Sequence, residues 1–217
     1  MWEHVMFIGG SSCAGKTTAA RMLANKYDLL YYSVDDDLGS LAAYGIQKGY
    51  PICCRHSRMS MEAFFSRPPA QQCRELLAFY KELHHRIMQT VAGLSDGRPV
   101  LAEGIAFLPS LMKEDGIPPE QYLCVAADPD FQVRHYRERS WTALFLEDCA
   151  DREKAFSSWM EREALFTGTA AGQAKLWGCG LISVETDADA AALPEKTEKY
   201  FRLKTTGFRQ KGAEGTV

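Results

Sequence analysis

A glycine-rich stretch near the N-terminus carries the clearest chemical signal in this chain. Residues 10–17 read Gly-Ser-Ser-Cys-Ala-Gly-Lys-Thr and match the pattern G-x-x-x-x-G-K-[ST] at every fixed position. Glycine tolerates positive φ, so successive backbone N–H groups can turn toward one anion. The stretch therefore predicts a loop that binds the phosphates of a nucleotide. The residues expected to do so are Gly10, Ser11, Ser12, Cys13, Ala14, Gly15, Lys16, Thr17 and Thr18.

Two of these residues have further expected roles. Lys16 should reach the β- and γ-phosphates and take part in catalysis, and the hydroxyl of Thr17 should bind Mg²⁺. Such a loop works only between a strand and a helix whose N-terminus faces the phosphates. The apolar residues 5–8 predict the strand, and apolar residues at helical spacing over 16–27 predict the helix. Cys13 lies where a helix N-terminus lowers the pKa of a thiol.

Three consecutive aspartates follow the strand expected over residues 29–34. Ligands of open α/β sheets bind beyond the carboxyl ends of the strands, so these acids should lie near the loop. Phosphoryl transfer uses a carboxylate to orient Mg²⁺ or to accept a hydroxyl proton. Asp35 and Asp36 are therefore catalytic candidates, Asp35 also a metal ligand, and Asp37 a substrate-binding candidate. The alternative for any one of them is a plain helix N-terminus, where Asp is common.

Glu103 ends the apolar run over residues 100–102 and precedes a glycine. An acid in this position corresponds to a Walker-B carboxylate, although that residue is usually Asp. The alternative is a residue that holds the acceptor of the phosphoryl group. We place Glu103 among the substrate-binding candidates.

Residues 38–75 contain five basic and two acidic residues and are interrupted by glycines and prolines. This composition predicts an insertion in short pieces, lying near the aspartates. Arg55, Arg58 and Arg67 are candidates to bind an anionic acceptor, because arginine pairs well with phosphate and carboxylate. The alternative is a solvated basic surface.

A second arginine-rich part follows Asp128-Pro129, a strong helix start. Residues 134–166 favour a mobile lid that brings cations onto the transferred group and excludes water. Arg134 and Arg137 lie three residues apart on one helix face and are catalytic candidates. The other candidates to bring positive charge onto the transferred group are Arg139, Arg152 and Arg162. The alternative is pairing with acids on the helix surface.

Composition narrows the class of protein. At 217 residues and 46% hydrophobic content the chain can form one α/β domain, expected over residues 1–204, with a flexible tail over 205–217. A formal net charge of −3 argues against general nucleic-acid or membrane binding. We expect a cytoplasmic protein, because no signal peptide or membrane span is evident and the seven scattered cysteines look like reduced thiols.

The order of loop, acids, insertion and arginine-rich lid resembles the P-loop small-molecule kinases, which include nucleoside-monophosphate, shikimate and gluconate kinases and chloramphenicol phosphotransferase. The resemblance covers residues 4–203 in architecture but is close in sequence only over 9–18. It implies an α/β three-layer sandwich with a five-stranded parallel sheet. It also implies an acid after the second strand that binds Mg²⁺ or acts as the base, and this role falls on Asp35 and its neighbours. It further implies lid arginines that contact the nucleotide, and this role falls on Arg134 and Arg137. Substrate identity does not transfer.

The sequence therefore predicts an ATP- and Mg²⁺-dependent kinase, a monomer or homodimer, that acts on a small anionic metabolite or nucleotide. The competing class is a nucleotide-dependent binding or regulatory protein that phosphorylates no acceptor. A kinase needs an acid near the γ-phosphate and an open acceptor pocket, whereas a regulatory protein needs only nucleotide and Mg²⁺.

Overall fold

The computed structural model describes residues 2–94 and 97–203. Its centre is one sheet of five parallel strands in the order β2-β3-β1-β4-β5. The strands are β1 (Val5–Gly10), β2 (Leu30–Ser33), β3 (Val100–Glu103), β4 (Tyr122–Ala127) and β5 (Gly180–Val184). The predicted α/β fold with a five-stranded parallel sheet is confirmed.

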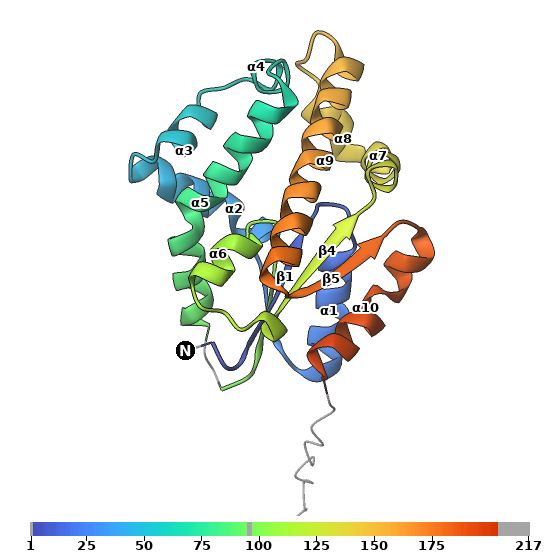
Figure 1. The fold of residues 1–217 in the computed structure, drawn as a ribbon. Coiled ribbons are helices and arrows are strands. Elements are labelled where there is room, and N and C mark those ends of the chain that lie inside the picture. The colour runs from blue at the N-terminus through green and yellow to red at the C-terminus, as the bar shows by residue number, and fades with distance from the viewer. Residues whose placement is uncertain (1, 95–96, 204–217) are drawn as a thin grey trace, which may run out of the picture.

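Helices cover both faces of this sheet (Figure 1). Neighbouring residues of a strand point to opposite faces, so both faces of a buried parallel strand are apolar. On one face Ile8 packs with the helices α1 and α10, and on the other Phe7 packs with α5, α6 and α9. The helices are α1 (Lys16–Tyr27), α10 (Asp187–Phe201), α5 (Pro69–Gly93), α6 (Pro109–Glu114) and α9 (Arg152–Trp177).

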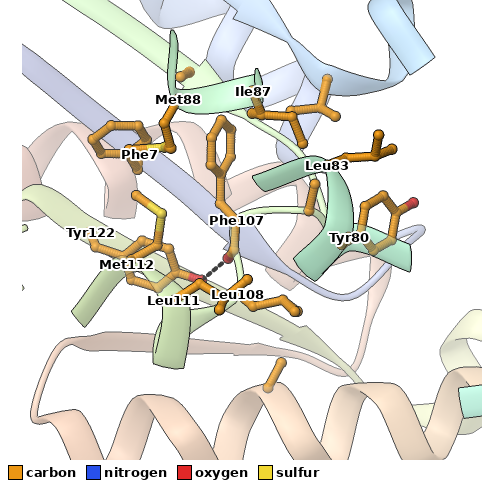
Figure 2. Close-up of a cluster of buried hydrophobic side chains, with 14 of the residues drawn as sticks. Phe7, Tyr80, Leu83, Ile87, Met88, Phe107, Leu108, Leu111, Met112 and Tyr122 are labelled. Atoms are coloured by element: carbon orange, nitrogen blue, oxygen red, sulfur yellow. Dashed lines mark hydrogen bonds between the residues drawn. The ribbon is translucent and has the colours of Figure 1, made fainter. Parts of the chain in front are cut away.

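On the second face, close to the glycine-rich loop, Tyr122 of β4 is hydrogen-bonded to the loop that follows β3. Its hydroxyl donates a hydrogen bond to the carbonyl oxygen of Phe107 at 2.7 Å, as Figure 2 shows. A Cβ at Gly9 would lie 2.0 Å from that hydroxyl oxygen and 2.4 Å from that carbonyl oxygen. At Gly10, which has a φ of 104°, a Cβ would lie 2.0 Å from the carbonyl oxygen of Val125. These two glycines are therefore required by packing against the sheet and its neighbouring loop.

The part predicted as an insertion is helical. It consists of α2 (Val34–Gln47), α3 (Pro51–His56) and α4 (Met61–Phe65), followed by the start of α5. Gly39 and Gly45 lie inside α2 and do not break it, unlike the short pieces that the glycines suggested. A Cβ at Gly45 would meet the sulfur of Cys53 at 2.5 Å, so this glycine lets α2 and α3 approach closely.

Residues 134–166, expected as a lid, span the end of α7 (Pro129–Glu138), α8 (Ser140–Phe145) and the first half of α9. The second half of α9 packs on β4 and α5 and belongs to the core. The first half joins α7 and α8 in a smaller apolar cluster that includes Phe65 from α4. Motion of this part stays a prediction.

Other features complete the fold. A short 3₁₀ helix, Pro119–Gln121, precedes β4. None of the described helices combines the length and the apolar character that a membrane crossing needs. The tail predicted over residues 205–217 lies outside the described residues.

Candidate active site

The glycine-rich loop connects β1 to α1 and has the backbone of an anion-binding nest. Gly10, Cys13 and Gly15 have φ angles of 104°, 57° and 81°. Left-handed residues placed between right-handed ones turn successive N–H groups toward one point. Gly15 is also the N-cap of α1, whose first N–H groups have no partner within the helix. The loop therefore has the backbone conformation that phosphate binding needs, and phosphate binding itself stays a prediction.

Ser11 fixes the loop to β4. Its backbone N–H donates to the carbonyl oxygen of Val125 at 2.8 Å, and its Oγ accepts the N–H of Ala127 at 2.7 Å. The side chain of Ser11 is fully buried. Its hydroxyl and its backbone N–H are thus both committed to β4, so Ser11 fixes the loop and supplies no free N–H to the nest.

A buried glutamine that sequence reasoning missed holds the next residue. Gln132 of α7 donates from Nε2 to the carbonyl oxygen of Ser12 at 2.9 Å, and its Oε1 accepts the hydroxyl of Thr167 at 3.3 Å. Gln132 therefore links the loop to α7 and α9. The one sequence signal was an uncharged polar residue between Phe131 and Val133, beside the apolar face of its helix.

Burial of Cys13 raises the pKa of its thiol to about 11, against the lowering effects of Arg139 and Lys16. The expectation that the helix N-terminus lowers this pKa is wrong, because removal of the thiolate from water outweighs the helix and the nearby cations. The thiol is protonated at neutral pH.

Lys16 is almost completely buried, with 6% of its surface exposed. Its Nζ donates to the carbonyl oxygen of Ser11 at 2.6 Å. An ammonium group has three N–H donors, so two remain for phosphate oxygens.

Thr17 and Glu103 meet at the end of β3. The Thr17 hydroxyl donates to Oε1 of Glu103 at 3.1 Å, and the Tyr31 hydroxyl donates to the same oxygen at 3.0 Å. Glu103 is fully buried, and its Oε2 has no hydrogen-bond partner among the described residues. A buried carboxylate oxygen without a partner is costly, and a cation would satisfy it.

These oxygen atoms fit Mg²⁺, which commonly binds to one or two carboxylates together with substrate phosphates and water. No group of three or more His, Cys, Asp or Glu residues forms a metal site within the described ranges, which fits a site completed by phosphates. Thr17 and Glu103 could therefore hold the ion. This geometry favours the Walker-B interpretation of Glu103 over the acceptor contact.

The three aspartates occupy the first turn of α2 and point in different directions, because successive helix residues are about 100° apart. Asp35 lines the cavity beside the loop. Asp36 pairs with Arg21 at 3.2 Å, and Asp37 accepts the hydroxyl of Tyr32 at 3.2 Å. The structure thus brings Asp35 to the loop but not Asp36 or Asp37.

The pKa of Asp35 is raised, mainly by partial removal of its carboxylate from water. Lys16 opposes this rise, and the negative charge of Glu103 adds to it. Asp35 is nevertheless an exposed residue, so its carboxylate is only partly shielded from water. A carboxylate with a raised pKa next to a phosphate loop can accept a proton from a hydroxyl.

The insertion arginines lie away from this cavity. Glu75 of α5 accepts hydrogen bonds from Arg55 at 3.1 Å and from Arg67, and its Oε2 lies 3.3 Å from Nε2 of His56. Arg58 is exposed. None of Arg55, Arg58 and Arg67 lines the cavity in the described part of the chain. The structure does not gather them into an anion site.

The lid arginines divide into outer and inner ones. Arg137 makes two hydrogen bonds to Glu153, at 3.2 and 2.9 Å, and Arg134 lies 3.9 Å from Asp187 at the surface. Neither lines the cavity formed by the described residues. Arg139, which ends α7 in an extended conformation, lines it instead, as does the buried Arg162 of α9.

The cavity has a volume of about 480 Å³ and reaches from the phosphate loop to aromatic side chains of the insertion and of α7, α8 and α9. Residues 12–18 form one end, with Asp35 and Arg139 beside them. A larger hollow of about 1110 Å³ lies at the opposite end of the sheet and contains none of the phosphate-binding candidates. The chemistry therefore belongs to the smaller cavity.

No protein-family model matches this chain. No curated protein matches it either. Among solved structures, a candidate kinase from Chloroflexus aurantiacus aligns at 17% identity over 94% of this chain and 100% of its own, with a TM-score of 0.48. Shikimate kinase from Bacteroides thetaiotaomicron aligns at 15% identity over 92% and 98%, with a TM-score of 0.47.

Shikimate kinase from Acinetobacter baumannii, in complex with shikimate, aligns at 14% identity over 90% of each chain, with a TM-score of 0.43. The chain is thus similar over most of its length to solved kinase structures. At these identities and TM-scores the likeness transfers neither activity nor substrate. A proposal for the activity and the substrate therefore has to be argued from the side chains around the cavity.

Proposed function

We propose that this protein is an ATP- and Mg²⁺-dependent phosphotransferase that acts on a small-molecule acceptor. The observation that carries the proposal is one cavity that is lined by the phosphate loop, by Asp35 and by side chains of the insertion and of α7, α8 and α9. A protein that only bound nucleotide would not need a carboxylate such as Asp35 in the cavity beside the loop.

The residues around the loop have complementary roles in this proposal. The nest and Lys16 hold the β- and γ-phosphates, and Arg139, which lines the same cavity, adds positive charge. Thr17 and Glu103 would hold Mg²⁺, which, when bound, neutralises charge on the phosphates. Preorganised positive groups stabilise the charge that develops during transfer.

The transfer itself is an in-line displacement. The hydroxyl oxygen of the acceptor forms a bond to the γ-phosphorus while the bond from that phosphorus to the β,γ-bridging oxygen breaks. The bridging oxygen keeps the electron pair and leaves as part of ADP. Asp35 accepts the hydroxyl proton, a role suited to a carboxylate whose pKa is raised.

The positions of the arginines change one expectation about the acceptor. Arg55 and Arg67 pair with Glu75, so the insertion does not present free cations to the cavity. We therefore assign the acceptor contacts to residues that line the cavity. A monomer or homodimer without nucleic-acid partners stays a prediction.

ADP release in the presence of a metabolite library tests the proposal. Wild-type protein is expected to release ADP in an acceptor-dependent way, and Lys16→Ala to lower kcat/KM by roughly a hundredfold or more, as loss of a central electrostatic contact does. Lys26→Ala, which removes a surface ion pair to Glu198, is the matched control. Acceptor-independent hydrolysis across the whole library would favour a nucleotide-dependent regulatory protein instead.

A further inference from the structure

Aromatic rings form much of the wall of the cavity. They come from both sides, α4 and α5 on one and α7, α8 and α9 on the other. The rings are those of Phe64, Phe79, Tyr136, Trp141, Phe145 and Trp159. Such a wall offers flat apolar surfaces at the point where an acceptor would lie.

Trp159 of α9 contacts the rings that come from α7 and α8. Its ring centre lies 4.9 Å from that of Tyr136, 5.2 Å from that of Phe145 and 5.9 Å from that of Trp141. Trp159 is buried, whereas Trp141 and Phe145 are each 42% exposed. Aromatic rings on the surface of a cavity stack well with planar ligands and poorly replace the water around a polyol.

One buried polar pair interrupts this wall. Nη2 of Arg162 donates to Oε1 of Glu163, which also accepts the indole N–H of Trp159 at 3.1 Å. Arg162 is 8% exposed and Glu163 1% exposed, yet Nε of the arginine and Oε2 of the glutamate have no partner among the described residues. Both side chains line the cavity.

The pair therefore leaves one buried N–H donor and one buried carboxylate acceptor without a partner among the described residues. Buried polar groups are usually satisfied, and a bound molecule with a neighbouring acceptor and donor would satisfy both at once. A ring edge that carries C=O beside N–H has this pattern. A sugar acid has neither the flat face nor this edge.

We propose that the acceptor is a planar heterocycle that carries a hydroxyl group, with a C=O and an N–H adjacent on its ring edge. This rests on the proposed phosphotransferase function and names the class of its acceptor. The ring packs between the aromatic side chains, its edge meets Arg162 and Glu163, and its hydroxyl points toward Asp35 and the loop. The hydroxyl oxygen takes the γ-phosphoryl group, its proton passes to Asp35, and ADP leaves.

Five probes with measured ADP release test this assignment. Guanosine and uridine have both the ring and the edge, 4-hydroxybenzyl alcohol has only the ring, and shikimate and gluconate have neither an aromatic ring nor that edge. We expect saturable ADP release with guanosine or uridine, and at least tenfold lower kcat/KM with 4-hydroxybenzyl alcohol. ADP release with shikimate or gluconate, but not with guanosine or uridine, would overturn the proposal. Absence of ADP release with every ring probe at millimolar concentration would also overturn it.

A variant pair separates acceptor contacts from nucleotide contacts. Trp141→Leu should raise the acceptor KM about tenfold and leave the KM for ATP nearly unchanged. Leu144→Ala on the same helix, where the side chain is 69% exposed and does not line the cavity, is expected to change neither. If Trp141→Leu raised the KM for ATP instead, the rings would belong to the base of the nucleotide and the assignment would be wrong.

Binding of a fluorescent ATP analogue, measured in the same samples, distinguishes two kinds of failure. Lys16-dependent binding together with turnover of shikimate or gluconate alone would contradict only the acceptor class. Absence of binding would contradict the phosphotransferase function, and with it the acceptor class.

Discussion

Gln132 of α7 donates a hydrogen bond from its side-chain amide to the backbone carbonyl of Ser12 at 2.9 Å, and so fixes the phosphate loop from outside its own strand and helix. The amide is buried and its oxygen accepts the hydroxyl of Thr167. The shape of the loop therefore depends on α7 and α9 as well as on its own glycines.

Removal of this amide should loosen the loop. Gln132→Ala leaves the carbonyl of Ser12 and the hydroxyl of Thr167 without their partner, at a cost of about 1–3 kcal/mol in the free energy of unfolding. We expect ATP affinity to fall by roughly tenfold, measured by titration with a fluorescent ATP analogue. Gln89→Ala, on the exposed side of α5, is the control. Equal affinities in the two variants would show that the loop holds its shape alone.

Glu103→Gln should separate metal binding from stability. The amide keeps the oxygen that accepts from Thr17 and Tyr31 but removes a buried charge. Burial of an unpaired charge is unfavourable, so the variant without nucleotide should unfold at the same or a higher temperature than wild type. The Mg²⁺ concentration at half-maximal ADP release should rise about tenfold or more. An unchanged Mg²⁺ requirement would remove Glu103 from the metal site.

Asp35→Asn and Asp36→Asn form a matched pair on neighbouring positions of α2. Asp35 lines the cavity and Asp36 pairs with Arg21, so only Asp35→Asn should lower kcat, by roughly 10²- to 10⁴-fold if Asp35 is the general base. The raised pKa of Asp35 places the acid limb of the wild-type pH profile above its ordinary value of 3.8. Activity rises with pH through that limb, because the base must be ionised. A similar loss of kcat in both variants would mean that the general base cannot be assigned to Asp35 rather than to Asp36.

The Glu75 cluster should control stability in acid. Burial alone would raise the pKa of Glu75, but hydrogen bonds from Arg67, Gln71 and His56 lower it to about 2 from an ordinary value of 4.5. A lowered pKa means that the stabilising contribution is complete above pH 4.5 and is lost as the pH falls toward 2. The shift corresponds to at most about 3 kcal/mol.

Urea unfolding of wild type and Glu75→Gln at several pH values measures this contribution. The difference in the free energy of unfolding should be largest near neutral pH and should shrink below pH 4.5, where wild-type Glu75 begins to take up a proton. Glu195→Gln, on α10, is the control. A difference that did not vary with pH would mean that Glu75 acts by packing alone.

Local sequence patterns were sufficient to predict the strands of the sheet and the phosphate loop. The helix expected over residues 16–27 has those bounds in the structure, because its apolar spacing and the loop before it are both local. The long helix over residues 152–177 was not predicted; its first half was expected only as part of a lid. Its first half packs in a small apolar cluster and its second half in the main core, so the helix has no single apolar face that the sequence pattern would reveal.

Directions of side chains were harder to predict than elements. Arg134 and Arg137 share the outer face of α7, and Arg139 reaches the cavity because the chain leaves the helix there. Arg55 and Arg67 turn to Glu75, whose position depends on how α3, α4 and α5 pack together. Side-chain direction of this kind follows from tertiary packing, which spacing along the chain does not describe.

The half-buried thiol of Cys13 gives the nucleotide site a chemical resistance of its own. With a pKa of about 11, only about one molecule in ten thousand carries a thiolate there at neutral pH. Peroxides and disulfides react with the thiolate and hardly at all with the thiol. A cysteine in the middle of a phosphate loop therefore reacts slowly with oxidants at neutral pH, and its position at a helix N-terminus does not by itself make the loop a redox sensor.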